Sequence, residues 1–295
     1  MASAKTVTEV GFQPPPPTTS KQLIVSFPAE HTVQLTLNRP EAMNAMSPTL
    51  QDDLERTLAW FDAEPSLWVG ILTGSGRIFC AGADLKAWDK EASSVHVSSG
   101  RHNPEGIVGT IHGFGSISRR TVSCKPLIAA VIGGAYGGGV EILLNCDLVI
   151  AADDATFGLP EVKVGATAAL GGIPRLVATA GLQRASEMLL LGRTISAHEA
   201  CSRFGFVNKT VPKTQVLIEA LSWAKTMVND CSPDAVQSTK RGMILAWQHG
   251  DVDSAMVKHA YSAESVRHYA GENIKEGLRA FGEKRKPKWT NPAKL

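Results

Sequence analysis

Residues 125–141 read KPLIAAVIGGAYGGGVE, a pattern typical of an α/β fold. The run from Leu127 to Ile132 is continuously apolar, as expected for a strand that is buried on both faces. A glycine pair ends this run, and three further glycines lead into a helix predicted over residues 140–144. A second apolar strand is predicted at residues 147–152. The order strand, helix, strand therefore predicts an α/β core.

The segments on either side extend this pattern. Before it, we expect paired strands at residues 23–27 and 32–37, a helix that begins at Ser47 and Pro48, and a buried strand at residues 68–73. After it, the chain becomes mainly helical, with one brief strand. The predicted helices cover residues 197–203, 214–229, 233–248, 253–269 and 272–285, and the strand covers residues 206–211.

These patterns predict a division of the chain into four parts. They are a flexible proline-rich tail (1–20), a core that holds the site (21–205), a mainly helical assembly region (206–290) and a short terminal tail (291–295).

The composition excludes several classes of protein. The chain has 295 residues, a net charge of +2 and 43% hydrophobic residues, which is globular composition with too little positive charge to indicate nucleic-acid binding. No apolar run approaches the length of a membrane span. The five cysteines show no metal-type spacing and read as reduced thiols of an intracellular protein.

Glu141 is the most informative polar residue, because its neighbours are apolar and a buried strand and three glycines precede it. Burial of a carboxylate raises its pKa, and a raised pKa suits proton transfer at neutral pH. Position alone leaves open the alternative that Glu141 faces solvent on an amphipathic helix.

Two glycine-containing turns offer backbone donors. The amides of residues 137–139 stand where a helix begins and have no acceptor within it, so they suit an oxyanion or a phosphate. Ala83, in the turn FCAGAD at residues 79–84, could supply a second amide. Either turn could instead be purely structural.

Glu161 is the second candidate acid, in the segment FGLPE at residues 157–161. Pro160 fixes the backbone before it. Taken by itself, this residue could equally be a surface carboxylate in a loop.

Other chemistries lack their motifs. The glycines form neither a Walker loop nor a dinucleotide fingerprint, there is no Gly-x-Ser-x-Gly elbow, and the eight histidines are scattered. We therefore expect no metal site.

Taken together, these segments resemble the crotonase (enoyl-CoA hydratase/isomerase) superfamily, most closely its enoyl-CoA hydratases. The ordered matches span roughly residues 22–290. They are LNRP (37–40) with NAM (44–46), FCAGAD (79–84), KPLIAAV (125–131) with GGAYGGGVE (133–141), CDL (146–148), FGLPE (157–161) and GGIPRL (171–176).

The resemblance implies a spiral of ββα units with a helical C-terminal trimerisation region, assembled as a homotrimer or a dimer of trimers. It implies an acyl-CoA substrate and no other cofactor, because coenzyme A is part of the substrate. The Ala83 and Gly138 amides match the oxyanion hole, and Glu141 and Glu161 match the two acids of the hydratases. The remaining positions that it assigns to substrate and coenzyme A are Ala81, Asp84, Leu85, Lys86, Gly137, Gly172, Phe281 and Lys284, with Phe281 and Lys284 near the coenzyme A of a neighbouring subunit.

The implied reaction is syn hydration of the 2,3 double bond, or its reverse. Glu141 would activate the water that attacks Cβ, and Glu161 would deliver a proton to Cα. Ala168 and Ala169 depart from the glycine that hydratases often carry there, which leaves substrate choice open. The alternatives are an isomerase, a hydratase for a branched acyl-CoA, and a non-enzymatic RNA-binding homologue suggested by the basic segment at residues 284–289.

The last three residues, Ala293, Lys294 and Leu295, predict import into peroxisomes, because they form a small, basic, leucine tripeptide like the Ser-Lys-Leu address. The partner would be the peroxisomal import receptor, and we expect prolines 287 and 292 to keep the segment extended and exposed. The alternative is a frayed tail on a cytoplasmic enzyme.

We expect a fluorescent protein fused to the N-terminus to accumulate in peroxisomes, since this fusion leaves the tripeptide free. Deletion of residues 293–295 is the control and should leave the fusion diffuse. Diffuse fluorescence both with and without the tripeptide would refute the targeting prediction and would leave the predicted enzyme activity untouched.

Overall fold

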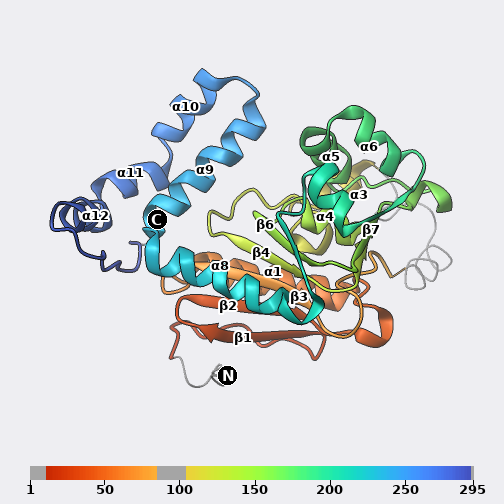
Figure 1. Cartoon of the computed structure of the whole chain (residues 1–295), viewed down its shortest axis with the longest axis horizontal. Coiled ribbons are helices and arrows are strands. Elements are labelled where there is room, and N and C mark those ends of the chain that lie inside the picture. Colours follow the sequence, from red (N-terminus) through yellow and green to blue (C-terminus); the bar gives the residue numbers. More distant parts are fainter. Residues whose placement is uncertain (1–10, 85–103, 294–295) are drawn as a thin grey trace.

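The computed structural model describes residues 11–84 and 104–293. Its larger sheet has six strands, and β1 and β2 lie along one edge of the molecule (Figure 1). β1 and β2 form an antiparallel pair, and each later neighbour pairs in parallel. In spatial order the strands are β1 (Leu23–Ala29), β2 (Thr32–Leu37), β3 (Val69–Gly74), β4 (Leu127–Val131), β6 (Leu148–Ala152) and β9 (Lys209–Val211).

A second, three-stranded sheet lies beside the first. It contains β5 (Gly134–Tyr136), β7 (Thr156–Gly158) and β8 (Thr194–Ser196). The chain passes from β4 to β5 and then into α4 (Gly138–Leu143), and it repeats this passage from β6 to β7 and a 3-10 turn, η4 (Glu161–Val164). These are the strand, strand, helix units that were predicted, so the spiral α/β fold is confirmed.

Two long helices pack against the large sheet. α1 (Pro48–Ala63) begins as predicted, with the Ser47 hydroxyl accepting the Leu50 N–H at 3.1 Å. α8 (Val216–Asp230) contacts β3, β4 and β6 and buries one residue in every four. The shorter helical segments are η2 (Pro40–Ala42), α3 (Pro104–Gly109), η3 (Phe114–Ser116), α5 (Gly172–Ala180), α6 (Leu182–Leu189), α7 (Ala197–Glu199), η5 (Ala200–Phe204) and η6 (Lys213–Gln215).

The last four helices extend away from the sheets as an arm (Figure 1). They are α9 (Pro233–His249), α10 (Val252–Ala260), α11 (Ala263–Ala270) and α12 (Glu272–Gly282). The single helix predicted at residues 253–269 is wrong, because the chain breaks at Tyr261 and Ser262. The Ser262 hydroxyl accepts the Ser265 N–H at 3.3 Å and begins α11. Serine is favoured at the N-cap of a helix and not in its interior, so Ser262 begins a new helix.

The predicted boundary after residue 205 does not separate core from arm. β9 pairs in parallel with β6, and α8 covers the sheet. The part that stands clear of the sheets therefore begins with α9.

The proline-rich segment packs against the core over residues 11–20, where we had predicted a flexible tail. The Phe12 ring lies 4.8 Å from the Phe27 ring and 5.2 Å from the Trp60 ring. The Trp60 indole N–H donates to the carbonyl of Pro14 at 3.0 Å. The segment is ordered and not flexible because the Phe12 ring packs against the aromatic rings of the core.

Residues 285–293, called here the C-terminal strap, fold back on the arm, and most of them, including Ala293, remain exposed. Arg285 pairs with Glu276 at 2.6 Å, and the Thr290 N–H donates to the Asn273 side chain at 2.9 Å. The strap also reaches the sheet, because the Trp68 indole N–H donates to Asn291 Oδ1 at 3.0 Å.

The end of the strap is held as well. Pro292 is buried, and the carbonyl of Ala293 accepts a hydrogen bond from Arg267 at 3.2 Å. Lys294 and Leu295 lie outside the described residues.

Candidate active site

Glu141 lies in the middle of α4 and is 3% exposed. One carboxylate oxygen, Oε1, accepts the backbone N–H of Gly172 at 2.9 Å. Gly172 is the first residue of α5, so the start of one helix fixes the orientation of an acid on another. The solvent-facing alternative for Glu141 is therefore excluded.

Glu161 begins η4, immediately after Pro160, and is half-buried. A Cβ atom added to Gly137 would lie 3.2 Å from Glu161 Oε1, so the carboxylate rests against the turn that starts α4. Its other oxygen, Oε2, is buried, and the described residues offer it no hydrogen-bond partner. A buried acceptor without a partner is costly, which is typical of a position where a ligand or water completes the site.

Burial changes the acidity of both glutamates. Removal from water raises the pKa of Glu141 to about 7, with the Gly172 N–H opposing this effect and the negative charge of Glu161 adding to it. Burial also raises the pKa of Glu161. Glu141 can therefore gain or lose a proton near neutral pH, as a general acid or base must.

The three glycines of residues 137–139 each face a different neighbour. A Cβ atom on Gly137 would approach Glu161, one on Gly138 would lie 2.5 Å from the ring of Phe114, and one on Gly139 would lie 2.5 Å from the carbonyl of Cys80. Only glycine fits such close approaches. The turn brings Glu161, the start of α4 and the Cys80 segment into one place.

The turn at Ala83 lies against the start of α4. Met46 donates to the carbonyl of Gly82 at 2.8 Å and accepts the N–H of Asp84 at 3.4 Å. Both bonds flank Ala83, so its own N–H points away from Met46. A Cβ atom added to Gly82 would lie 3.4 Å from the Gly138 nitrogen.

The two predicted oxyanion donors are thus on adjoining turns. Gly138 opens α4, and its N–H therefore has no acceptor within the helix. Within residues 11–84 and 104–293, neither the Ala83 nor the Gly138 amide donates to a protein acceptor. Two unengaged amides beside one buried and one half-buried acid are the donors and proton carriers that a developing enolate requires.

Four other predicted binding residues lie beside the two acids or in the turn that contains Ala83. Gly137 and Gly172 contact the two acids, and Ala81 donates its N–H to the carbonyl of Met43 at 3.0 Å. Asp84 pairs with Arg39 at 3.2 Å.

Of the four remaining predicted contacts, two lie among the described residues and two do not. Leu85 and Lys86 lie outside the described residues. Phe281 and Lys284 are exposed, at the far end of α12 and just after it, across the molecule from α4 (Figure 1). They do not reach the glutamates of their own chain.

Phe114 and Ser118 complete the site, and the sequence patterns did not reveal them. Phe114 packs its ring on Gly138, and the Ser118 hydroxyl bonds to the loop before Gly172. The glycines at residues 113 and 115 predict a tight turn here, but they do not predict which residues this turn contacts.

Two further features are absent from the described residues. No group of histidine, cysteine, aspartate and glutamate side chains there could hold a metal ion. No helix in that part of the chain has the length and apolarity to cross a membrane.

Comparison with known proteins decides the family. The family model described as enoyl-CoA hydratase/isomerase matches residues 29–292. The chain belongs to the enoyl-CoA hydratase/isomerase family. As a member, it is a hydro-lyase of the enoyl-CoA hydratase type, which confirms the enzyme class predicted from the sequence.

Individual relatives agree with this placement. The chain is 44% identical over 277 residues to the mevalonyl-coenzyme A hydratase sidH of Aspergillus fumigatus, covering 92% of this chain and 96% of that one. It is also 44% identical over 268 residues to the protein of the same name in Beauveria bassiana, covering 90% and 93%. The crystal structure of enoyl-CoA hydratase EchA1 from Mycobacterium marinum superposes with a TM-score of 0.79 at 34% identity, covering 92% and 99%.

The raised pKa of Glu141 predicts a pH-dependent cost in stability. Between pH 4.5 and about 7 the folded chain keeps a proton that the unfolded chain has released, so the free energy of unfolding falls as pH rises through this window. The shift from 4.5 to about 7 corresponds to about 3 kcal/mol. We expect Glu141→Gln, which cannot ionise, to be more stable than wild type at pH 8 and nearly equal to it at pH 5.

Thermal unfolding at both pH values measures this difference. Glu30→Gln is the matched control, because the Glu30 side chain is 85% exposed and should unfold like wild type at both pH values. An effect of Glu141→Gln that is independent of pH would show that Glu141 titrates as an ordinary glutamate.

Proposed function

We propose that Glu141 and Glu161 together hold and activate one water molecule for reversible hydration of an acyl-CoA double bond. The observation that carries this proposal is the pair of acids with raised pKa values on either side of the Gly137 turn, beside two unengaged amides.

In the hydration direction, ionised Glu141 takes a proton from water as the water oxygen bonds to Cβ. Protonated Glu161 gives a proton to Cα. In the dehydration direction, Glu161 removes the Cα proton and Glu141 protonates the departing hydroxyl group. The raised pKa values support this exchange, because each acid must be able to hold a proton near neutral pH.

The Ala83 and Gly138 amides receive the thioester oxygen in this proposal. Negative charge grows on that oxygen as the enolate forms, and donors already fixed in place need no reorganisation to stabilise it. Coenzyme A enters as part of the substrate, and no further cofactor is required.

For the substrate we propose mevalonyl-CoA or a closely related branched acyl-CoA. Two relatives at 44% identity carry the name mevalonyl-coenzyme A hydratase, whereas relatives named enoyl-CoA hydratase match at 33%. Mevalonyl-CoA carries both a hydroxyl and a methyl group on Cβ, so its dehydration is the same chemistry on a branched carbon. The Ala168 and Ala169 departure is consistent with an acyl pocket that differs from that of linear hydratases.

The test is turnover of an acyl-CoA panel followed by enoyl absorbance. We expect mevalonyl-CoA to be dehydrated with a higher kcat/KM than linear 3-hydroxyacyl-CoAs. Glu141→Gln and Glu161→Gln should each lower the rate by about 10²-fold or more, the usual scale for loss of general acid–base help. Glu30→Gln should retain full activity.

Several outcomes would contradict this proposal. Near-wild-type turnover in both glutamate variants would exclude the two-acid mechanism. A shifted double bond without water uptake would indicate an isomerase. Salt-sensitive RNA binding that survives loss of both acids would favour the binding protein, although Arg285 of the basic segment is already paired with Glu276.

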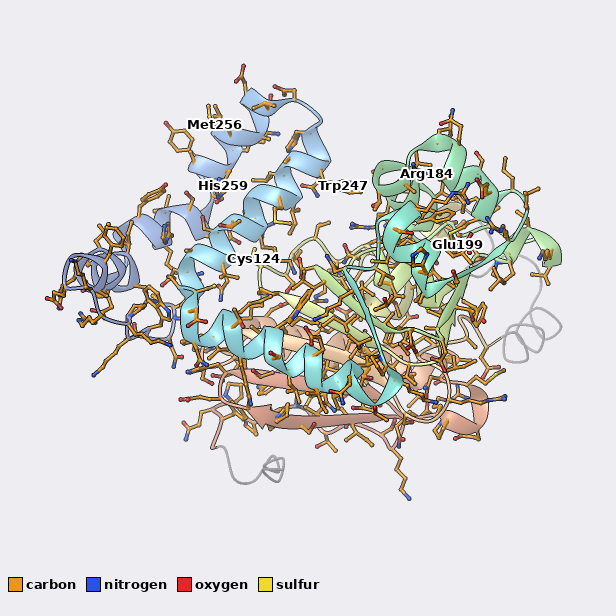
Figure 2. All side chains as sticks on the ribbon, in the orientation of Figure 1. Cys124, Arg184, Glu199, Trp247, Met256 and His259 are labelled. Atoms are coloured by element: carbon orange, nitrogen blue, oxygen red, sulfur yellow. The ribbon has the colours of Figure 1, made fainter. Side chains whose placement is uncertain are left out.

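We also propose that other copies of the chain cover the helical arm, as a homotrimer or a dimer of trimers. Its exposed apolar side chains are spread over all four helices, and contact with other copies would remove this apolar surface from water. Figure 2 labels two of them, Trp247 and Met256. The full set is Met243, Trp247, Val252, Met256, Val257, Tyr261, Val266, Tyr269, Leu278 and Phe281.

Sedimentation at micromolar concentration should therefore show a trimer or a hexamer. Met256→Glu should shift the distribution toward monomer, because it places a charge in the proposed contact between copies. Leu190→Glu is the control at an exposed leucine outside the arm and should leave the assembly intact. A wild-type monomer would contradict the proposal.

A further inference from the structure

Ser118 lies at the point where two parts of the site meet. Its side chain is completely buried. The hydroxyl oxygen accepts the backbone N–H of Phe114 at 2.7 Å, and the hydroxyl donates to the carbonyl of Leu170 at 2.5 Å. One side chain thereby satisfies a buried donor on one segment and an acceptor on another.

The first of these bonds leads to the oxyanion turn. Phe114 lies in η3, and its ring packs so closely on Gly138 that a Cβ atom there would be 2.5 Å from ring carbons. Its backbone position is therefore coupled to the backbone of Gly138. The bond from the Phe114 N–H to Ser118 fixes that position.

The second bond leads to Glu141. Leu170 precedes Gly171 and Gly172, and the Gly172 N–H donates to Glu141 Oε1 at 2.9 Å. The backbone at Leu170 also stabilises the ionised form of Glu141. The hydroxyl of Ser118 therefore holds the loop whose amides orient the acid.

A third contact reinforces the same junction. The carbonyl of Ser118 accepts a hydrogen bond from Arg175 Nε at 3.0 Å, and Arg175 lies on α5, just after Gly172. The Arg175 guanidinium also stacks over the Trp247 ring at 4.5 Å, which ties α5 to α9 of the arm. Both the side chain and the backbone of Ser118 thus hold the segment that begins α5.

We infer that Ser118 is a positioning residue for the reaction, which keeps the Gly138 amide and the Glu141 carboxylate in register with each other. This inference rests on the proposed roles of Glu141 and Gly138. Ser118 itself acts through Phe114 and Leu170.

A hydroxyl group is needed because the junction requires one atom that accepts and donates at once. Alanine would leave a buried N–H and a buried carbonyl without partners, and cysteine would replace strong hydrogen bonds with weak ones. The chain can relieve that cost only by moving the two segments. Such movements of about 1 Å at supporting residues cost on the order of 10²-fold in rate.

The test compares Ser118→Ala with wild type on the substrate that the panel selects. We expect kcat to fall on the order of tenfold to a hundredfold with KM changed by less than about threefold. The pH profile should change too. Loss of the Gly172 N–H from the Glu141 carboxylate raises the pKa of that acid above about 7, so the corresponding limb of the profile should move to higher pH.

Ser116→Ala is the matched control. Ser116 lies on the same loop, is also buried, and donates to the carbonyl of Gln51 on α1. It should retain the wild-type pH profile. If Ser118→Ala does not fold, Ser118→Cys keeps a weak donor and acceptor at this position and should show the same kcat loss and pH shift to a smaller extent.

The outcomes separate this inference from the proposed function. If Glu141→Gln is inactive while Ser118→Ala and Ser118→Cys match Ser116→Ala in kcat and pH profile, the positioning role is refuted and the two-acid mechanism stands. If Glu141→Gln is fully active, the mechanism itself fails. Titration of the Glu141 carboxyl by ¹³C NMR gives the direct readout, because a general loss of stability would not shift it.

Discussion

The site depends on how closely the backbone at residues 137–139 approaches three other segments. Each of these glycines stands against a different neighbour, and a single Cβ atom at any of them would push one component away. Glu161 packs against Gly137, and the segment that leads to Ala83 packs against Gly139. Two acids and two amides that are far apart in sequence can meet because no side chain lies between them.

Placing two acids in this site lowers the stability of the fold. Glu141 is buried among apolar residues with a charge that the fold only partly compensates, and Glu161 Oε2 has no partner among the described residues. A more stable chain would carry neutral side chains at both positions. The acids are retained at a cost because strain and unsatisfied groups concentrate where chemistry takes place.

Much of this could be predicted from the sequence, because some residues carry their own signal. The apolar run before the glycines indicated a buried strand, and the apolar neighbours of Glu141 indicated a buried acid. The contacts of Ser118 carried no such signal, because they join segments about 50 residues apart through a loop without periodicity. The path of the C-terminal strap was not predicted, because a pair such as Arg285 and Glu276 forms only after the helix before it has folded.

The position of α8 has a consequence for synthesis on the ribosome. The apolar face formed by β3, β4 and β6 is covered by a helix that is made much later in the chain. After Ala152 ends β6, the chain must continue to Asp230 before α8 is complete. At roughly 5–20 residues per second, the nascent sheet stays uncovered for on the order of ten seconds. During that interval the emerging chain presents a broad apolar surface to molecular chaperones, and a ribosome that stalls before α8 would leave a fragment prone to aggregate.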